Sequence, residues 1–387
     1  MNHKKRILVV SHAATRNGAT ILLLDLLRWL KKHTGYQFDI LVNGGGELID
    51  DFRSIGLTTI WRNPDRVFAM FPQGFARRKY ESYLLRLLML RREYDLLYLN
   101  TSSVASHASA LSHVASRILW HIHEMDYALH NSLGNTDAGR LLPLATRFVA
   151  VSTSVRDALV HNFAVPADKI DIAQGFVTVP SFSPEQAYTT RKRIHDQFGW
   201  PDHSFVVGGC GALGWRKGTD IFLQIAHWMT KSDTLGNRRF FWIGGGSRDE
   251  VLRFEHDIRC LGLQTVCKHL PSSGDVLKYY HAMDAFALTS REDPFPLVML
   301  EAAASCLPIV CFAGSGGGPE FVGNDSGCVV PYLNVAAFVE CLEQLRNQPD
   351  ERRKMGQIGN RKVRTQFTAD VLAPKILASI ECCLASA

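Results

Sequence analysis

The stretch TSREDPFPLVMLEAAASCLPIV, residues 289–310, places two carboxylates beside a predicted helix. Asp293 lies in a proline-rich turn, and we expect Glu301 on the first turn of the apolar helix that follows. Hydrophobic spacing in residues 276–288 predicts a helix and then a buried strand. Both carboxylates are therefore expected at the carboxyl end of a strand, where open α/β sheets bind their ligands. A helix N-terminus at this edge presents N–H groups and a positive dipole end, so one site can hold a phosphate and sugar hydroxyls.

Strands and helices alternate on both sides of this stretch, which predicts an α/β fold with doubly wound parallel sheets. Residues 180–205 are polar, rich in Pro and Ser and without a clear strand, so we place a domain boundary there. The predicted helices include 21–31, 220–229, 276–282 and 371–385. The predicted strands are 7–10, 38–42, 96–99, 118–122 and 147–151 before the boundary, and 205–209, 240–243, 285–288 and 308–312 after it.

The composition is that of a folded protein with two domains. The chain has 387 residues, of which 46% are hydrophobic and 21% are charged. No apolar run reaches the roughly 18 residues that a membrane span needs. The apolar run after the basic N-terminus, residues 7–10, is too short for a signal peptide. The nine cysteines show no zinc-ligand spacing, so we predict reduced, mostly buried thiols and a cytoplasmic location.

Positive charge is concentrated in the first half of the chain. Residues 1–180 hold 21 Lys and Arg against 15 Asp and Glu, whereas the remaining residues hold 22 of each. This imbalance favours an anionic partner, such as a phosphorylated lipid or an acidic membrane surface. The basic and apolar segment 75–92 is interpreted first as a surface helix, with peripheral contact to the inner face of the membrane as the alternative. The modest excess and the lack of a recognisable module argue against nucleic-acid binding.

Glycine-rich loops follow several of the predicted strands, and glycine lets the backbone approach a ligand closely. The sequence GCGALG at 209–214 matches a dinucleotide fingerprint in form. Trp215, Arg216 and Lys217 separate it from the next helix, and no acidic residue follows about 20 positions later at a strand end, so an NAD site is disfavoured. We interpret Arg216 and Lys217 as a cationic clamp for a diphosphate, with an exposed basic turn as the alternative.

Two histidines occur where a predicted strand meets a loop, in WHIHEMDY at 120–127. Strand alternation places His121 and His123 on the same face. Two histidines without a clear third ligand make a poor zinc site, and we predict no metal. One histidine that binds a hydroxyl or a phosphate is the preferred interpretation, and a core histidine bonded to the backbone is the alternative.

The order and spacing of several segments in residues 206–331 carry a family resemblance. These segments are GALGWRKGTD, FFWIGGG, DVLKYYHAMDAFALTSREDPFPLVMLEA, LPIV and GGGPEFV, and SHAATRNGAT, HIHE and VSTSVRDAL in the first half match less closely. Together they resemble the retaining glycosyltransferases of family 4, which have the GT-B fold. The resemblance implies two Rossmann-like domains that face each other across a cleft. Residues 1–185 would bind the acceptor, residues 200–365 would bind the nucleotide sugar, and the helix 366–387 would pack back on the N-terminal domain.

The resemblance also implies roles for individual residues. Asp293 would lie near the donor sugar, Glu301 would bind ribose hydroxyls, and His123 would be the histidine of the cleft, with His121 as an alternative. These three, Asp293, Glu301 and His123, are the catalytic candidates. The predicted donor-binding residues are Gly18, Arg216, Lys217, Phe295, Pro296, Leu297, Val298, Gly317 and Glu320.

Two positions depart from the family pattern. The first acid of the family is usually glutamate, whereas this chain has Asp293, with Glu292 beside it as an alternative candidate. The family arginine at a Gly-Arg-Leu strand end is replaced by Ala212. The diphosphate clamp then depends on whether Arg216 takes the place of this arginine.

The implied function is transfer of a sugar from a nucleotide-sugar donor to a glycan or lipid-linked glycan acceptor, with retention of the anomeric configuration. Bacterial surface polysaccharide synthesis is the expected context. The resemblance implies no metal and no cofactor beyond the nucleotide sugar, which is a co-substrate. The alternatives are a GT-B nucleotide-sugar epimerase or hydrolase, and a non-catalytic nucleotide-sugar-binding protein, for which Ala212 is the main support.

Overall fold

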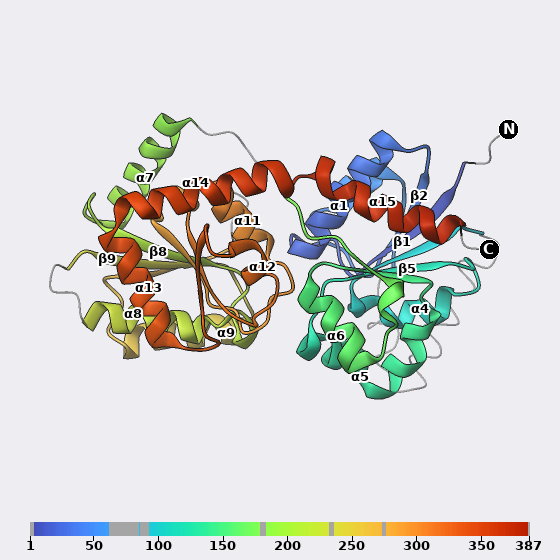
Figure 1. Ribbon diagram of the computed structural model, residues 1–387, viewed down its shortest axis with the longest axis horizontal. Helices are drawn as coiled ribbons and strands as arrows, with labels where there is room; N and C mark the ends of the chain where they lie inside the picture. The colour runs from blue at the N-terminus through green and yellow to red at the C-terminus, as the bar shows by residue number, and fades with distance from the viewer. Residues whose placement is uncertain are drawn as a thin grey trace. The chain divides into compact units, whose positions relative to one another are not determined.

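The computed structural model describes residues 4–61, 85, 93–178, 183–231, 236–272 and 276–385 and divides the chain into two compact units (Figure 1). The first unit contains Met1–Gly175 and Ala369–Ala387, and the second contains Phe176–Thr368. Each unit is built on one parallel sheet, which confirms the predicted α/β class with two doubly wound domains. The segment 75–92, with its predicted membrane contact, lies outside the described residues except for Leu85.

The first unit has a seven-stranded sheet in the order β3-β2-β1-β4-β5-β6-β7, and all neighbours pair in parallel. The strand order reverses between β1 and β4, which marks the crevice where such sheets bind ligands. Its strands are β1 (Arg6–Ser11), β2 (Gln37–Val42), β3 (Leu57–Ile60), β4 (Leu96–Asn100), β5 (Ile118–Ile122), β6 (Arg147–Ala150) and β7 (Ile170–Ile172). Its helices include α1 (Gly18–His33), α2 (Ile49–Ile55), α4 (Ala105–Leu111), α5 (Asp126–Leu141), α6 (Thr153–Phe163) and α15 (Ala369–Ala385), with 3-10 turns η1 (Ser102–Val104), η2 (Leu142–Leu144) and η3 (Ala167–Lys169).

The second unit has a six-stranded parallel sheet in the order β10-β9-β8-β11-β12-β13. Here the order reverses between β8 and β11. Its strands are β8 (Phe205–Cys210), β9 (Arg238–Ile243), β10 (Cys267–Leu270), β11 (Ala285–Leu288), β12 (Ile309–Phe312) and β13 (Gly327–Val330). Its helices include α7 (Pro184–Phe198), α8 (Thr219–Lys231), α9 (Arg248–Cys260), α10 (Leu277–Tyr280), α11 (Leu297–Ala304), α12 (Gly318–Val322), α13 (Val335–Asn347) and α14 (Pro349–Gln366), with the 3-10 turn η4 (Trp215–Lys217).

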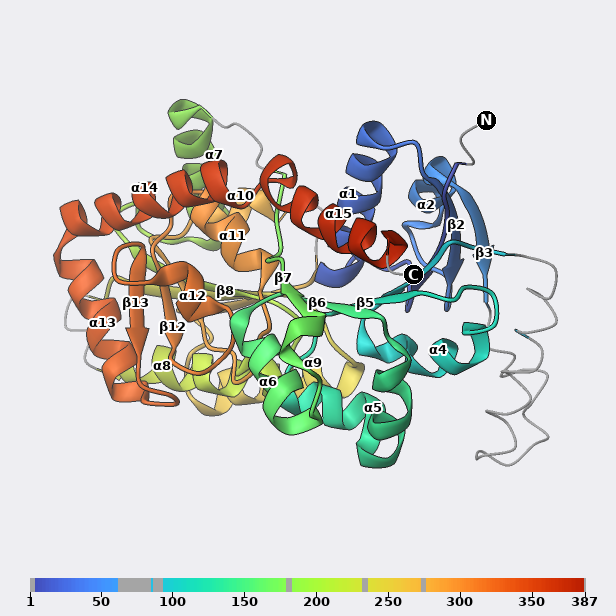
Figure 2. The same ribbon diagram turned by 45° about the vertical axis from the view of Figure 1, so that its right-hand side comes forward.

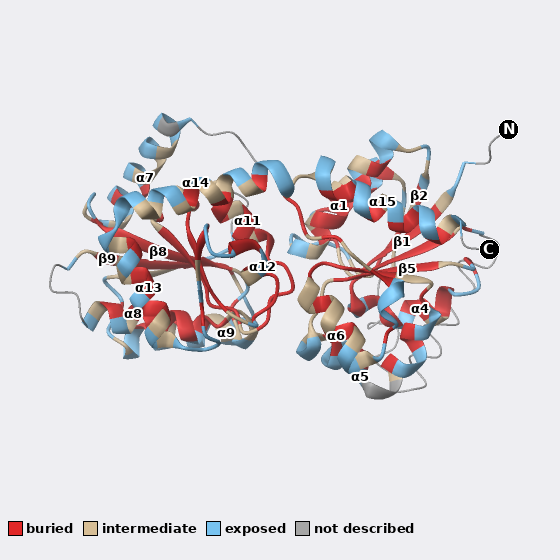
Figure 3. Cartoon of the chain, in the orientation of Figure 1, coloured by how far each residue is buried: buried red, intermediate tan, exposed pale blue. Residues whose placement is uncertain are grey.

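Helices cover both faces of each sheet. In the first unit α1 and α15 lie on one face and α4, α5 and α6 on the other, and in the second unit α11 and α14 lie opposite α8 and α13 (Figure 2). Every residue of the central strands β4, β5, β8, β11 and β12 is therefore buried (Figure 3). Such two-sided burial explains why these strands read as continuous apolar runs in the sequence.

Helix α15 belongs to the first unit, although it ends the chain. It packs against α1, β5 and β6. Two side-chain bonds fix it there: Trp29 Nε1 donates to Asp370 at 2.8 Å, and Ser379 Oγ donates to Asp171 at 2.7 Å. The chain therefore leaves the first unit at Gly175 and returns to it at Ala369.

The polar stretch 180–205, where the sequence placed the domain boundary, contains helix α7 of the second unit, and the first unit ends earlier, at Gly175. Ser183 caps α7 by accepting from the Gln186 amide, while the Gln186 side chain bonds back to the Ser183 amide. Gly199 ends the helix in the left-handed conformation, with φ 64°. This capping box and C-cap stabilise a helix whose surface is too polar to show a strong apolar stripe.

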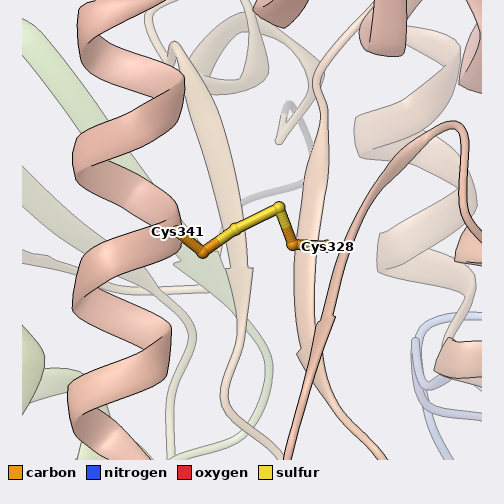
Figure 4. The surroundings of a disulfide bond; sticks show 2 residues. All are labelled: Cys328 and Cys341. Carbon is orange, nitrogen blue, oxygen red and sulfur yellow. A yellow bond between two sulfur atoms is a disulfide. The ribbon is translucent and has the colours of Figure 1, made fainter.

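Cys328 on β13 and Cys341 on α13 form a disulfide (Figure 4). The prediction of reduced thiols was wrong for this pair, because the fold brings together a strand and a helix whose cysteines lie 13 positions apart in sequence. The other seven cysteines are free thiols. Burial raises the pKa of Cys210, Cys267 and Cys311 to about 12, so these thiols stay protonated at neutral pH.

Candidate functional site

The carboxyl edge of the second sheet carries a buried ion pair at the reversal of strand order. Lys217 Nζ lies 2.6 Å from Asp293 Oδ2, and Ser290 Oγ donates to the same carboxylate oxygen at 3.0 Å. The Lys217 side chain is 16% exposed and that of Asp293 is 7% exposed. The fold therefore joins two residues that the sequence analysis assigned to one site, although they are 76 positions apart.

The turn η4 is held against the end of β11 by hydrogen bonds to its backbone carbonyls. Thr289 Oγ1 donates to the Lys217 carbonyl at 3.0 Å, and the Arg291 amide donates to the Arg216 carbonyl at 2.8 Å. Gly218 has φ 64°, and a Cβ there would lie 2.0 Å from the Thr289 oxygen. Only glycine fits this approach, so it sets the position of the Lys217 ammonium group.

Arg291 completes this scaffold and was not singled out in the sequence analysis. Its guanidinium makes a bidentate ion pair with Asp220 at 2.8 and 2.7 Å and donates to the Trp215 carbonyl at 2.8 Å. It also lies over the Trp215 ring, 5.4 Å from the centroid. These contacts fix both ends of η4. The sequence shows an arginine in a loop but carries no signal for partners more than 70 positions away.

The loop around Asp293 pairs with the glycine-rich loop after β12. The Asp293 amide donates to the Ser315 carbonyl at 2.7 Å, and the Gly317 amide donates to the Asp293 carbonyl at 3.1 Å. A Cβ on Gly317 would lie 2.4 Å from the Phe295 ring and 2.5 Å from the Pro294 carbonyl oxygen. The predicted site residues Asp293 and Gly317 are therefore in direct backbone contact.

Glu301 lies on the second turn of α11, not on the first as predicted. Pro296 is the N-cap of this helix with an extended backbone, so the first helical residue is Leu297. The Tyr280 hydroxyl donates to Glu301 Oε2 at 3.0 Å. Burial raises the pKa of Tyr280 well above its ordinary value, so its hydroxyl remains a donor at neutral pH. Glu301 therefore acts as a positioned acceptor held by a buried phenol, and first-turn dipole stabilisation does not apply to it.

The remaining predicted residues of the second unit surround this edge. Phe295 is buried, and its ring centroid lies 5.6 Å from that of Phe367, on which it stacks. Its side chain therefore belongs to the core, and only its backbone amide is a candidate for ligand binding. Leu297 and Val298 begin α11, where amides lack helical acceptors. Arg216 is half-buried, and its guanidinium has no hydrogen bond or ion pair within the described part of the chain. Glu320 lies on the short helix α12, and the substituted position Ala212 is exposed in the loop after β8.

Gly18 and His123 lie in the first unit. Gly18 is the exposed first residue of α1, directly after the N-cap Asn17. His123 follows β5, and its Nε2 lies 2.9 Å from Asn100 Oδ1. The rings of His121 and His123 are 4.1 Å apart, which agrees with the predicted common face, and His121 bonds to the buried Tyr98 hydroxyl at 2.7 Å.

Three imidazoles, His12, His121 and His123, gather at the carboxyl edge of the first sheet. Burial lowers the pKa of His12, lowers that of His121 to about 3 and holds that of His123 well below its ordinary value. All three are therefore neutral near pH 7 and act through hydrogen bonds. No group of three potential metal ligands occurs among the residues that the structure describes. In the same residues, no helix is long and apolar enough to cross a bilayer.

Comparisons with known proteins agree with this architecture. Residues 190–362 match the family model for glycosyl transferases group 1, and residues 16–179 match that for glycosyltransferase family 4. A D-inositol 3-phosphate glycosyltransferase of Corynebacterium kroppenstedtii is 29% identical over 219 residues, which are 55% of this chain and 48% of that protein. A protein of the same name from Paenarthrobacter aurescens is 24% identical over 57% of this chain and 53% of its own length. The chain thus matches about half the length of these curated relatives.

Solved structures share the fold at low sequence identity. Anabaena Alr3699/HepE in complex with UDP and glucose has a TM-score of 0.80 at 19% identity and covers 98% of this chain and 100% of that one. Sucrose-phosphate synthase from Thermosynechococcus elongatus has a TM-score of 0.76 at 16% identity, over 99% and 100% of the two chains. With family models matched on both units and the same two-sheet architecture, the chain belongs to the group 1, family 4 glycosyltransferases and has the GT-B fold.

Proposed function

We propose that this protein transfers a sugar from a nucleotide-sugar donor to a glycan or lipid-linked glycan acceptor, with retention of configuration, in surface polysaccharide synthesis. The observation that carries the proposal is the buried Lys217–Asp293 pair at the strand-order reversal of the second sheet. Arg216 is next to it in sequence, and its guanidinium has no partner among the residues that the structure describes. Cations and helix N-terminal amides at this edge suit the diphosphate of a nucleotide sugar.

In this proposal Lys217, Arg216 and the first amides of α11 stabilise the negative charge that develops on the leaving diphosphate. Such preorganised donors act on charge that is larger in the transition state than in the bound substrate. They supply this stabilisation from the protein, so the reaction needs no resident metal. Glu301, held by Tyr280, accepts hydrogen bonds from the ribose hydroxyls, and Asp293 lies near the sugar.

The carboxylate of Asp293 is already bonded to Lys217 and Ser290, which makes it a poor nucleophile. We therefore propose a front-face reaction. The bond between the anomeric carbon and the phosphate oxygen breaks, the bond to the acceptor oxygen forms on the same face, and the acceptor proton passes to the leaving phosphate. A covalent sugar trapped on Asp293 would contradict this route.

UDP-sugars are the first donors to test, since Alr3699/HepE is described in complexes with UDP, UDP and glucose, and UDP-glucose. Thermal unfolding is compared with UDP, GDP, ADP, dTDP and their common sugar conjugates. A ligand at about 100 times its dissociation constant adds about 2.7 kcal/mol, a shift of a few degrees. Glu301→Gln should abolish the shift, whereas the surface variant Glu351→Gln should keep it. No shift with any nucleotide would contradict the donor site.

Activity is then measured with the donor that shifts unfolding and a panel of acceptors that includes inositol phosphates, because the curated relatives are named for such an acceptor. A product formed only when donor and acceptor are both present, with the donor's anomeric configuration by NMR, supports the proposal. Free sugar or an isomer formed without acceptor would identify a hydrolase or an epimerase. Donor binding without turnover would favour the non-catalytic alternative that Ala212 raises.

A further inference from the structure

A chain of hydrogen bonds in the first unit determines which nitrogen of His123 carries the proton. Asn100, the last residue of β4, is fully buried. Its Nδ2 donates to the Ala19 carbonyl on α1 at 3.3 Å, and its Oδ1 lies 2.9 Å from His123 Nε2. A carbonyl only accepts hydrogen bonds, so the Asn100 atom that faces Ala19 must be the amide nitrogen.

The orientation of the Asn100 amide then fixes the His123 ring. Because Oδ1 of Asn100 can only accept, His123 Nε2 must carry the hydrogen. In a neutral imidazole the other nitrogen, Nδ1, then has a lone pair and no hydrogen. Burial keeps the ring neutral, since it holds the pKa of His123 well below its ordinary value.

Nδ1 of His123 is the open end of this chain. It has no hydrogen-bond partner among the described residues, yet it is not sealed in the interior, so it faces accessible space. The backbone of the same residue is anchored by Glu124, whose Oε2 accepts from the His123 and Ser102 amides at 3.0 and 2.9 Å. Asn100 thus holds one nitrogen of the ring and Glu124 holds the backbone, which leaves Nδ1 as the unoccupied acceptor.

The backbone beside Asn100 is strained. Thr101 has φ 78° and ψ 158°, a region that is almost restricted to glycine and is exceptional for a β-branched residue. Two bonds hold it there: the Thr101 amide donates to the His121 carbonyl at 2.9 Å, and Trp120 Nε1 donates to the Thr101 carbonyl at 2.8 Å. Both partners belong to β5, so this strand holds the backbone directly after Asn100 in its strained conformation.

We propose that Asn100 is a positioning residue that holds His123 in the tautomer with the proton on Nε2, so that Nδ1 accepts a hydrogen bond from a sugar hydroxyl. The inference rests on the proposed function for the identity of the ligand, but the tautomer itself does not. With the other tautomer, Nδ1 would carry a hydrogen and could not orient the hydroxyl by accepting a hydrogen bond from it. Asn100 acts through His123 and has no direct part in the chemistry.

The tautomer is measured first, by 15N NMR of the imidazole nitrogens in the full-length protein without ligand. His123→Gln identifies the His123 signals. We expect a protonated Nε2 and an unprotonated Nδ1 in the wild-type protein, and a mixture of tautomers in Asn100→Leu. If Asn100→Leu does not fold, Asn100→Ser removes the amide with a smaller change. The exposed Asn162→Ala serves as control and should leave the His123 signals unchanged. A wild-type ring with its proton on Nδ1 would refute the inference, whatever the enzyme activity.

Release of UDP from UDP-glucose with the acceptor panel gives the second readout. Asn100→Leu should lower kcat/KM by roughly tenfold, the scale of one neutral hydrogen bond, while the thermal shift with UDP stays unchanged. An Asn100→Leu protein with mixed tautomers but wild-type turnover would overturn the positioning role and leave the proposed function intact. A wild-type protein with the expected tautomer but no turnover of any donor would overturn the proposed function, and with it the role assigned to Nδ1.

Discussion

Lys217→Met should destabilise the second unit by about 3–4 kcal/mol, because it leaves a buried carboxylate without its counterion. The ammonium and carboxylate are 2.6 Å apart, and the Asp293 side chain is only 7% exposed, so water cannot replace the lost partner. Ser290 Oγ remains as a single neutral donor to the carboxylate. Asp293→Asn should cost less, about 2 kcal/mol, since Lys217 is more exposed and its flexible stem can turn toward solvent.

The double variant tests whether the two residues act as a pair. In the Lys217→Met and Asp293→Asn double variant, no buried charge is left unpaired, so the loss should fall short of the sum of the single losses by about 2 kcal/mol. The surface pair of Lys354 with Glu351, whose side chains are 67% and 44% exposed, provides a matched control. Lys354→Met should change stability by less than about 0.5 kcal/mol.

Hydrogen exchange followed by mass spectrometry measures these effects locally. Peptides that cover β11 and α11 report the opening free energy around Asp293, and peptides of β4 and β5 in the first unit serve as an internal reference. Single losses that simply add in the double variant would show that Lys217 and Asp293 do not interact, and the ion pair would then have no part in shaping the site. Loss of the UDP-dependent shift in Lys217→Met would further support the diphosphate contact.

Three further predictions concern stability. Burial lowers the pKa of His107 to about 4, so the unfolded chain binds this proton first as the pH falls below about 6.5. The contribution of His107 to stability is present above that pH and should fall by about 3 kcal/mol toward pH 4, so the total decline in urea titrations should be smaller by about this amount in His107→Gln. Thiol titration of the denatured, unreduced protein should find seven free cysteines. Loss of the disulfide in Cys341→Ser should lower the free energy of unfolding by about 3 kcal/mol, because the disulfide closes a loop between cysteines 13 positions apart. Gly244→Ala should lower the free energy of unfolding by about 3 kcal/mol or more in thermal unfolding, because φ is 151° and the new Cβ would lie 1.9 Å from a backbone oxygen. The control Gly236→Ala should lower it by about 1 kcal/mol, because φ is 63° and no atom lies within 4 Å of the new Cβ.

The central strands could be predicted from the sequence because both of their faces are buried. β4, β5, β11 and β12 appear as continuous apolar runs, and each was expected within one residue of its observed ends. The strands β3, β7, β10 and β13 were not predicted. They are the edge or outermost strands, only three or four residues long, and their sequences include polar, charged or glycine residues. Their pairing depends on a neighbour strand and not on their own pattern.

The sequence of helix α7 contains the residues that begin and end a helix, although no helix was predicted there. Ser183, Pro184 and Gln186 form the N-terminal signature of a helix, and Gly199 forms its C-cap, yet the polar composition favoured a linker. The contacts of Arg291 and Asn100 are a different case. Each depends on partners brought in from other elements, Asp220 and Trp215 for the first and Ala19 and His123 for the second. No local pattern in one sequence specifies such pairs.

The two units place side chains of different character at equivalent points of similar sheets. At the carboxyl edge of the second sheet are the cationic side chains of Lys217 and Arg216, which in the proposed reaction supply the positive charge that a leaving diphosphate needs. At the carboxyl edge of the first sheet, His123 is held by Asn100 and presents a neutral nitrogen, because burial keeps the imidazole uncharged. A neutral acceptor suits a hydroxyl that must be oriented but not deprotonated in advance, because in the front-face route its proton passes to the leaving phosphate. In this proposal the hydroxyl needs no strong base before the transfer, so the tautomer of His123 matters more to the reaction than its basicity.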